Sequence, residues 1–148
     1  MTEGYIITKE FDAPIGLVWD MFVTPEHFAY WWGGSDVVVP LDSIELDARD
    51  GGTWKATMVG PDNAWSINWI GEYREVIAPT RLVMTLTDDA SNPARDFFEI
   101  DLEEIANGTK VTLHQGGGNL TPEQYEQAKA GTDGFLETLR ERLIEVQA

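Results

Sequence analysis

The stretch Phe11-Asp12-Ala13-Pro14-Ile15-Gly16-Leu17-Val18-Trp19-Asp20, followed by Thr24-Pro25-Glu26-His27-Phe28-Ala29-Tyr30-Trp31-Trp32, decides the fold of this chain. Pro14 suits the first turn of a helix, because the N–H that proline lacks is not needed there. Thr24-Pro25 repeats the signal, with the Thr24 side chain as a cap. We therefore expect two short helices directly after one opening strand.

Segments of alternating polarity recur between turn signals from about residue 36 to about residue 115. In one of them Phe98, Ile100 and Leu102 alternate with acidic residues. Such alternation is typical of an antiparallel sheet with one buried face and one wet face. Asn107-Gly108 predicts a two-residue hairpin turn before the last strand.

A long helix is expected after these strands. Thr121-Pro122-Glu123 opens it with a cap, a first-turn proline and an acid. Gly131 and Gly134 should weaken its middle. The helical stripe beyond them consists of Phe135 or Leu136, Leu139, Leu143 and Val146. One face of this helix must therefore lie on the sheet.

This order of elements resembles the SRPBCC superfamily, which has the helix-grip fold of StAR-related lipid-transfer (START) domains and birch-pollen allergens. Within it, the chain is most similar to the family like the activator of the ninety-kilodalton heat-shock-protein ATPase. The residues that carry the resemblance are Ala13-Pro14, Val18-Trp19, Pro25 before Trp31-Trp32, 47–52, 71–76, 79–83 and 108–113. The family's usual Gly-Trp opening of the last helix appears here as Gly134-Phe135.

The resemblance implies an α+β fold in which a curved antiparallel β-sheet wraps around a long C-terminal α-helix, with two short helices after the first strand. At 148 residues the chain has the length of one domain. We therefore expect a single SRPBCC/START-like domain over residues 1–148.

The formal net charge of −16 comes from 26 acidic and 10 basic residues, and Lys and Arg form no cluster. This balance argues against nucleic acid and against anionic membrane surfaces as partners. No apolar run approaches the roughly 20 residues of a membrane span, and no secretory leader is visible, so a cytoplasmic protein without membrane insertion is expected. The acidity either keeps the surface soluble or fits a basic patch on a protein partner.

Residues that could carry chemistry are few. The chain has no cysteine, and its two histidines, His27 and His114, lie far apart in sequence, so no metal site and no cofactor are expected. Val111 and Leu113 define a buried face, which predicts that His114 points to solvent. His27, in the second short helix, is also expected to be exposed. Asp36 is a candidate catalytic acid or base, but a loop-capping role is favoured. We therefore expect no catalytic residue.

Six tryptophans are many for this length, and large aromatic side chains suit a wall that binds rings and acyl chains. Alternation places Trp54, Trp65 and Trp69 on the covered face of the sheet, where they either line a pocket or fill the core. One of Trp31 and Trp32 should face inward. The expected ligand-binding residues are Trp31, Trp32, Trp54, Met58, Trp65, Trp69, Tyr73, Met84, Phe98, Gln115 and Phe135.

These residues favour binding of a small hydrophobic ligand, such as a lipid, in a cavity between the sheet and the last helix, as in a carrier or sensor. The resemblance also implies two alternatives: a co-chaperone-type protein-interaction module linked to the stress response, and a cyclase- or hydrolase-like enzyme that uses the same cavity. The almost purely apolar wall favours binding over catalysis. Monomer and dimer both fit the sequence, because an exposed sheet edge can be blunted by charge or paired.

Overall fold

The fold is described for residues 4–148 of a computed structural model. Its elements in chain order are β1 (Tyr5–Phe11), α1 (Ile15–Val23), α2 (Pro25–Trp31), η1 (Leu41–Ser43), β2 (Glu45–Leu46), β3 (Thr53–Val59), η2 (Pro61–Asn63), β4 (Ser66–Ile77), β5 (Arg81–Leu86), β6 (Asp96–Ile105), β7 (Gly108–Gly116) and α3 (Pro122–Gln147). Across the described range, no helix is both long and apolar enough to cross a membrane.

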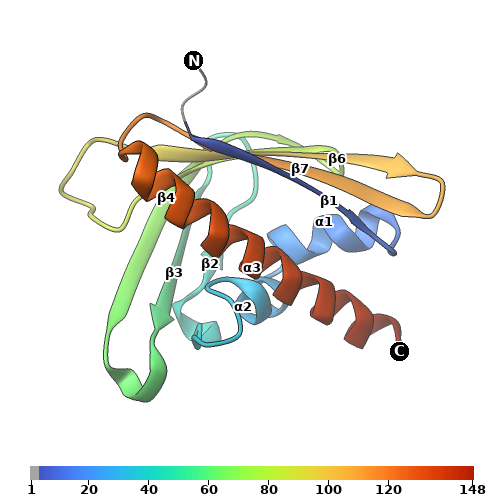
Figure 1. Cartoon of the computed structure of the whole chain (residues 1–148), viewed down its shortest axis with the longest axis horizontal. Coiled ribbons are helices and arrows are strands. Elements are labelled where there is room, and N and C mark those ends of the chain that lie inside the picture. Colours follow the sequence, from blue (N-terminus) through green and yellow to red (C-terminus); the bar gives the residue numbers. More distant parts are fainter. Residues whose placement is uncertain (1–3) are drawn as a thin grey trace.

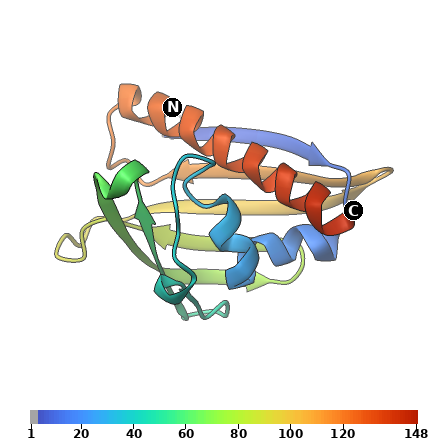
Figure 2. The ribbon, with the colours of Figure 1, turned by 90° about the horizontal axis from the view of Figure 1, so that it is seen from below.

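The strands form one antiparallel sheet in the order β1-β7-β6-β5-β4-β3-β2. Figure 1 shows this sheet as a curved layer, with the β3–β4 hairpin bent toward the side that carries the helices. The helices α1, α2 and α3 lie on that concave side, and α3 runs across it (Figures 1 and 2). The expected α+β helix-grip fold is therefore confirmed.

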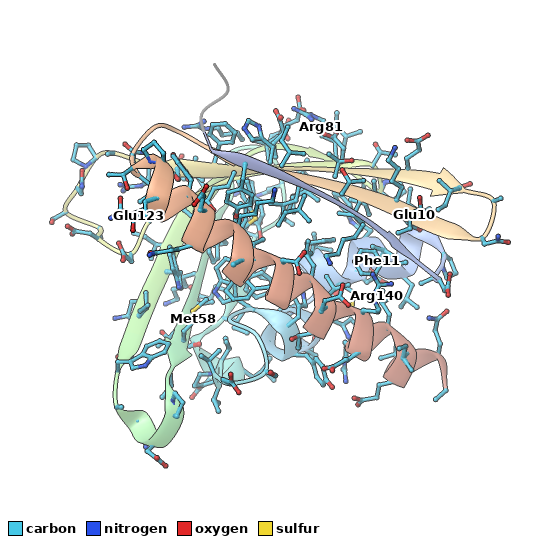
Figure 3. All side chains as sticks on the ribbon, in the orientation of Figure 1. Glu10, Phe11, Met58, Arg81, Glu123 and Arg140 are labelled. Atoms are coloured by element: carbon cyan, nitrogen blue, oxygen red, sulfur yellow. The ribbon has the colours of Figure 1, made fainter. Side chains whose placement is uncertain are left out.

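Burial along β6 follows the predicted alternation: Phe98, Ile100 and Leu102 are buried under the helices. Arg81 lies on the opposite, outer face (Figure 3), where it pairs with Glu75, Glu99 and Asp101. The sheet thus has one apolar face and one charged face, as an antiparallel sheet covered on one side requires.

Helix α3 begins with the predicted cap. The Thr121 side chain accepts a hydrogen bond from the Gln124 backbone N–H at 3.1 Å, and the Gln124 side chain accepts one from the Thr121 backbone N–H. The helix continues through Gly131 and Gly134, which face solvent. At the start of α2 the expected side-chain cap is absent, since Thr24 contributes only its backbone there.

The β6–β7 hairpin forms where expected, but its turn lies one residue earlier than predicted. Ala106 and Asn107 make the turn, and Gly108 is already the first residue of β7. A Cβ atom on Gly108 would lie 2.0 Å from the backbone oxygen of Phe11. Close approach of β1, in addition to turn conformation, explains this glycine.

Candidate functional site

Aromatic side chains fill the space between the sheet and α3. Trp32, directly after α2, lies at their centre. Its ring contacts Phe28, Trp54, Trp69, Phe98 and Phe135 at centroid distances of 5.0, 5.5, 6.0, 6.0 and 5.5 Å. We call these six residues the aromatic cluster. The cluster joins three strands to two helices at the place where the sequence predicts a ligand-binding wall.

The adjacent tryptophans face different parts of the interior. The Trp31 indole N–H donates to the backbone oxygen of Met21 at 2.7 Å, and its ring packs against Phe22 at 5.3 Å. Trp31 therefore anchors α2 on α1. Trp32 is the member of the pair that faces the sheet and α3, but both indoles are buried, so the expectation that only one of them faces inward is wrong.

The other expected wall residues divide into buried ones and one exposed one. Met58, Tyr73 and Met84 are buried on the concave face, and Met58 Sδ accepts a hydrogen bond from the Trp69 indole at 3.3 Å. Trp65 is not covered as expected, because its side chain is 44% exposed. It precedes β4, at the end of a hairpin that extends beyond the helices (Figure 1). The alternation of polar and apolar residues along a strand does not show how much of the sheet the helices cover.

Two buried polar atoms on the concave side lack a partner. Among residues 4–148, neither the Trp32 indole N–H nor the Tyr73 hydroxyl has a hydrogen-bond partner within the protein. Burial raises the pKa of Tyr73, with a further contribution from the charge of Asp47. Buried polar groups are normally hydrogen-bonded, so each of these two atoms keeps a hydrogen-bonding capacity that the surrounding side chains do not use.

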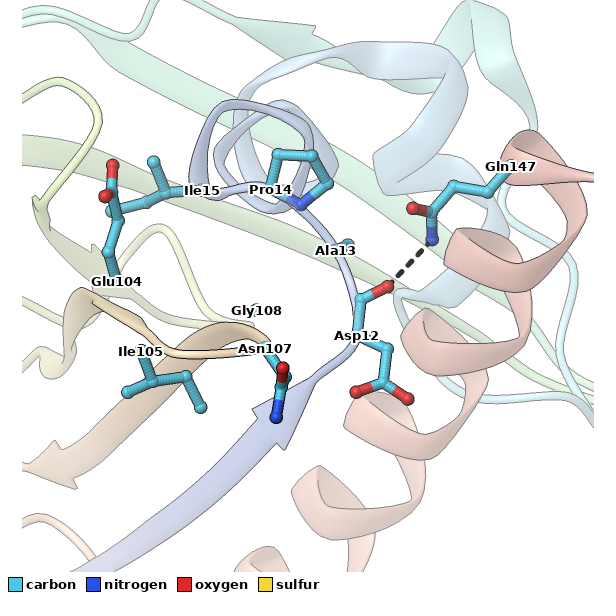
Figure 4. Close-up of a pocket in the computed structure, with 9 residues that line it drawn as sticks. All are labelled: Asp12, Ala13, Pro14, Ile15, Glu104, Ile105, Asn107, Gly108 and Gln147. Carbon is cyan, nitrogen blue, oxygen red and sulfur yellow. Dashed lines mark hydrogen bonds between the residues drawn. The ribbon is translucent and has the colours of Figure 1, made fainter.

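A cleft of about 450 Å³ lies away from these atoms. It is bounded by the turn after β1, the β6–β7 hairpin and the end of α3, where the Gln147 amide donates to the backbone oxygen of Asp12 at 3.2 Å (Figure 4). Ala13 is its one buried lining residue within the described chain. A shallow cleft with exposed walls offers a ligand little desolvated surface.

A smaller cleft of about 220 Å³ adjoins the aromatic cluster. We call it the Asp96 cleft. The residues that matter for its chemistry are Trp69, Leu86, Asp88, Asp96, Gln115 and Leu120. Apolar side chains and one aromatic ring form part of its wall. Asp96, at the start of β6, is a carboxylate that is only 7% exposed.

Hydrogen bonds from three segments converge on the Asp96 carboxylate. Gln115 Nε2 on β7 donates to Asp96 Oδ2 at 2.9 Å. Asn119 Nδ2 in the loop before α3 and the Tyr125 hydroxyl on α3 donate to Oδ1 at 2.8 and 3.3 Å. An ionised carboxylate offers about four acceptor positions, so one of them is left on Oδ2.

A second chain of hydrogen bonds orients Gln115. Tyr5, opposite Gln115 in the β1–β7 register, donates its hydroxyl proton to Gln115 Oε1 at 2.6 Å. The Thr132 hydroxyl on α3 lies 2.6 Å from the same tyrosine oxygen and must be the donor, because Tyr5 has already used its proton. Gln115 Oε1 is thereby fixed as the acceptor, and its amide nitrogen is directed at Asp96. Burial raises the pKa of Tyr5 to about 12, so this phenol stays neutral.

The glycines after β7 wrap closely around this carboxylate. Gly117 has φ +127°, and a Cβ atom there would lie 2.6 Å from Asp96 Oδ1. The Gly118 N–H donates to the Tyr125 hydroxyl at 2.8 Å. The glycines between β7 and α3 thus leave room for a buried carboxylate.

Sequence reasoning found Gln115 and missed the rest of this network. The missed residues are Tyr5, Asp96, Asn119, Tyr125 and Thr132. A usable signal existed for Asp96, because it continues the alternation of Phe98, Ile100 and Leu102 by one step. For Thr132 the signal is helical spacing, four residues before the buried Leu136.

The two histidines lie apart from the Asp96 cleft. His114 is on the outer face, as predicted, with Nδ1 3.5 Å from Glu99. His27 was expected to be exposed, but it is partly buried, and its Nδ1 accepts a hydrogen bond from Arg142 at 3.2 Å. Within residues 4–148, no group of three or more His, Asp or Glu side chains is placed to hold a metal ion.

Comparison with known proteins places this architecture in a family. Residues 12–145 match the family described as "Activator of Hsp90 ATPase homolog 1-like protein". No curated protein sequence matches the chain. A solved structure of a Chromobacterium violaceum protein is 24% identical, with a TM-score of 0.83 over 97% of this chain and 98% of that one.

Two further solved structures carry the family name in their titles. An AHSA1-like protein from Aeromonas hydrophila is 23% identical, with a TM-score of 0.76 over 97% of this chain and 94% of that one. An AHSA1 protein from Silicibacter pomeroyi is 19% identical, with a TM-score of 0.82 over 95% of this chain and 96% of that one. Identities this low show a shared fold. Because the family match itself spans most of the sequence, the chain belongs to the family of proteins like Activator of Hsp90 ATPase homolog 1.

Proposed function

We propose that this protein binds a small hydrophobic molecule between the sheet and α3, with the Asp96 cleft as the entrance. Family membership supports a ligand-binding or interaction domain of the SRPBCC type. The observation that carries the choice of ligand binding is the Trp32 indole N–H. It is buried within the aromatic cluster and has no acceptor among the described residues.

An unsatisfied buried donor costs about 1–3 kcal/mol. A ligand that brings an acceptor into the aromatic cluster would recover that free energy, while the surrounding rings supply apolar contact. The ligand is therefore a mainly apolar molecule with at least one oxygen or nitrogen acceptor.

Space in the cleft limits the size of this molecule. Typical small-molecule pockets measure about 300–1,000 Å³, whereas the Asp96 cleft measures about 220 Å³. Trp69 borders both the cleft and the aromatic cluster, and it is only partly buried. A larger ligand would enter by displacing Trp69, whose indole is held by one weak hydrogen bond to sulfur.

The test uses octanol, which has an apolar chain and one hydroxyl, with two matched variants. Trp32→Phe removes the unpartnered N–H and keeps an aromatic ring. Trp31→Phe removes the neighbouring N–H, which is satisfied by Met21. Calorimetric titration should show octanol binding weakened about tenfold in Trp32→Phe, as expected for one lost hydrogen bond. Octanol binding should be unchanged in Trp31→Phe. This variant should instead have a lower free energy of unfolding, because it loses the hydrogen bond to Met21.

Native mass spectrometry of freshly purified protein, followed by denaturing extraction, should in addition reveal a small molecule that is lost on unfolding. Absence of octanol binding to the wild-type protein would contradict the proposal. So would equal weakening of octanol binding in both tryptophan variants, because the effect would then reflect general loosening of the interior.

A second candidate function is protein interaction through the acidic surface. It is favoured by the net charge of −16 and by the family description, which names an activator of another protein's ATPase. A partner with a basic patch that is held by this charge should dissociate as salt rises from about 0.05 to 0.5 M, because screening shortens the reach of surface charges. Salt-independent capture would contradict an electrostatic contact.

A further inference from the structure

The Asp96 cleft carries a charge pattern that narrows the class of ligand. Among residues 4–148, its lining contains two carboxylates, Asp88 and Asp96, and no Lys, Arg or His side chain. The neighbouring Arg95 directs its guanidinium to the backbone oxygens of Asn92 and Ala94 and borders a different cleft. Within the described part of the chain, no basic side chain in the cleft therefore compensates the charge of Asp96.

The hydrogen bonds that Asp96 makes within the described chain leave one acceptor position of its carboxylate unused. Gln115, Asn119 and Tyr125 supply three neutral donors, and the fourth acceptor position, on Oδ2, is unused within the described chain. A buried carboxylate whose partners are all neutral lacks a compensating positive charge. A cationic donor at the fourth position would supply both the last hydrogen bond and the missing charge.

The rest of the cleft suits the body of such a molecule. Leu86 and Leu120 supply apolar surface. The Trp69 indole N–H is occupied by Met58, so what the ring can offer a ligand is its face, which attracts cations and packs against alkyl chains. The excess of acidic residues over the whole chain raises the local concentration of cations.

We propose that the natural ligand is an amphipathic amine, whose protonated nitrogen binds Asp96 Oδ2 while its apolar body extends past Trp69 and carries a separate oxygen or nitrogen acceptor to the Trp32 N–H. This inference rests on the proposed function and specifies the head group of the ligand. It predicts that, among molecules of equal chain length, a cation binds more tightly than a neutral molecule or an anion.

The test compares three probes of equal chain length: octylammonium, octanol and octanoate. Octylammonium has no acceptor for the Trp32 N–H, so the probes are compared in the Trp32→Phe background, where none of them can form that bond. Calorimetric titration near pH 7 should then show octylammonium binding at least about tenfold more tightly than octanol, and octanoate binding most weakly, because one charge-assisted hydrogen bond distinguishes the series. Asp96→Asn should remove the preference for octylammonium over octanol. Glu103→Gln, which removes an exposed outer charge on β6, is the matched control and should keep that preference.

A second measurement covers the case in which Asp96→Asn fails to fold. In the wild-type protein, the side-chain amide NMR signals of Gln115 and Asn119 should shift with octylammonium and much less with octanoate, because both amides bond the carboxylate that the amine would contact. Octylammonium binding that leaves these signals unmoved would overturn the proposal.

The outcomes separate this inference from the proposed function. Equal binding of octylammonium and octanoate would overturn the amine assignment. A folded Asp96→Asn variant that still prefers the amine would do the same. In either case, octanol binding would still support a hydrophobic ligand. Failure of all three probes to bind would contradict both.

Discussion

The two halves of α3 contact the sheet in different ways. The first half, residues 122–134, reaches it through polar groups: Tyr125 donates to Asp96, Thr132 lies 2.6 Å from the Tyr5 hydroxyl, and Asp133 pairs with Lys9 on β1 at 2.9 Å. The second half, residues 135–147, contributes the fully or almost fully buried side chains of Leu136, Leu139 and Leu143. Arg140 also lies over the ring of Phe11, beside which it is seen in Figure 3, and bonds the backbone oxygen of Glu10.

This difference separates stability from site geometry within one helix. Apolar burial is non-directional and contributes about 25 cal/mol per Å² of buried surface. Hydrogen bonds contribute only about 0.5–1.5 kcal/mol each, but they are directional. The second half should therefore hold the helix in place, while the first half orients Gln115 and the donors around Asp96.

The largest effect is expected in the apolar half. Leu139→Ala should lower the free energy of unfolding by about 2–5 kcal/mol, because it removes buried methyl groups and leaves a cavity. Urea denaturation followed by circular dichroism measures this change. The matched control is Ile144→Ala on the same helix, where the side chain is 63% exposed and the loss should be small. Equal losses of stability in both variants would show that the buried leucines do not hold α3 in place more than its exposed side chains do.

A pH-dependent effect of intermediate size is expected at Tyr5, which contacts the polar half. Burial raises its pKa from 10.0 to about 12. The unfolded chain therefore loses this proton first, and stability falls as pH rises from about 10 to about 12, by up to about 1.4 kcal/mol per pH unit. Denaturation curves across this range should show a shallower loss for Tyr5→Phe. The same slope in both proteins would show that Tyr5 ionises as freely in the folded state as in the unfolded chain.

The smallest effect distinguishes two threonines on the same helix. Thr132→Val removes the bond to Tyr5 and should cost about 1 kcal/mol of stability. Thr138→Val removes only a bond to the Gly134 oxygen within α3 and should cost less. Both side chains are buried, and both substitutions keep a β-branched shape. A larger loss at Thr138 would mean that the polar half does not depend on its contact with the sheet.

Much of the fold could be predicted because its signals are local. The alternation of β6 and the cap at Thr121 both appear in the structure as expected. Local signals failed where position within the assembled fold mattered. Trp65 keeps the phase of its strand but lies beyond the cover of the helices, and Thr24 has the right identity for a cap without making the bond.

The candidate site was predicted only in part, because its polar members are distant in sequence. The hydrogen bond between Tyr5 and Gln115 spans 110 residues, and that between Tyr5 and Thr132 spans 127. Each of these residues alone is an ordinary polar residue. Periodicity could place Gln115 and the aromatic wall on the concave face, but only the assembled sheet brings the Asp96 carboxylate and its donors together.

The pairing of β1 with β7 has a consequence for the growing chain. Ribosomes add about 5–20 residues per second, so β1 waits on the order of 5–20 s before the strand that it pairs with has been made. During that time its backbone hydrogen-bonding groups are open to other chains. Lys9 and Glu10 place opposite charges in this short strand, which makes it a poor template for aggregation while synthesis continues.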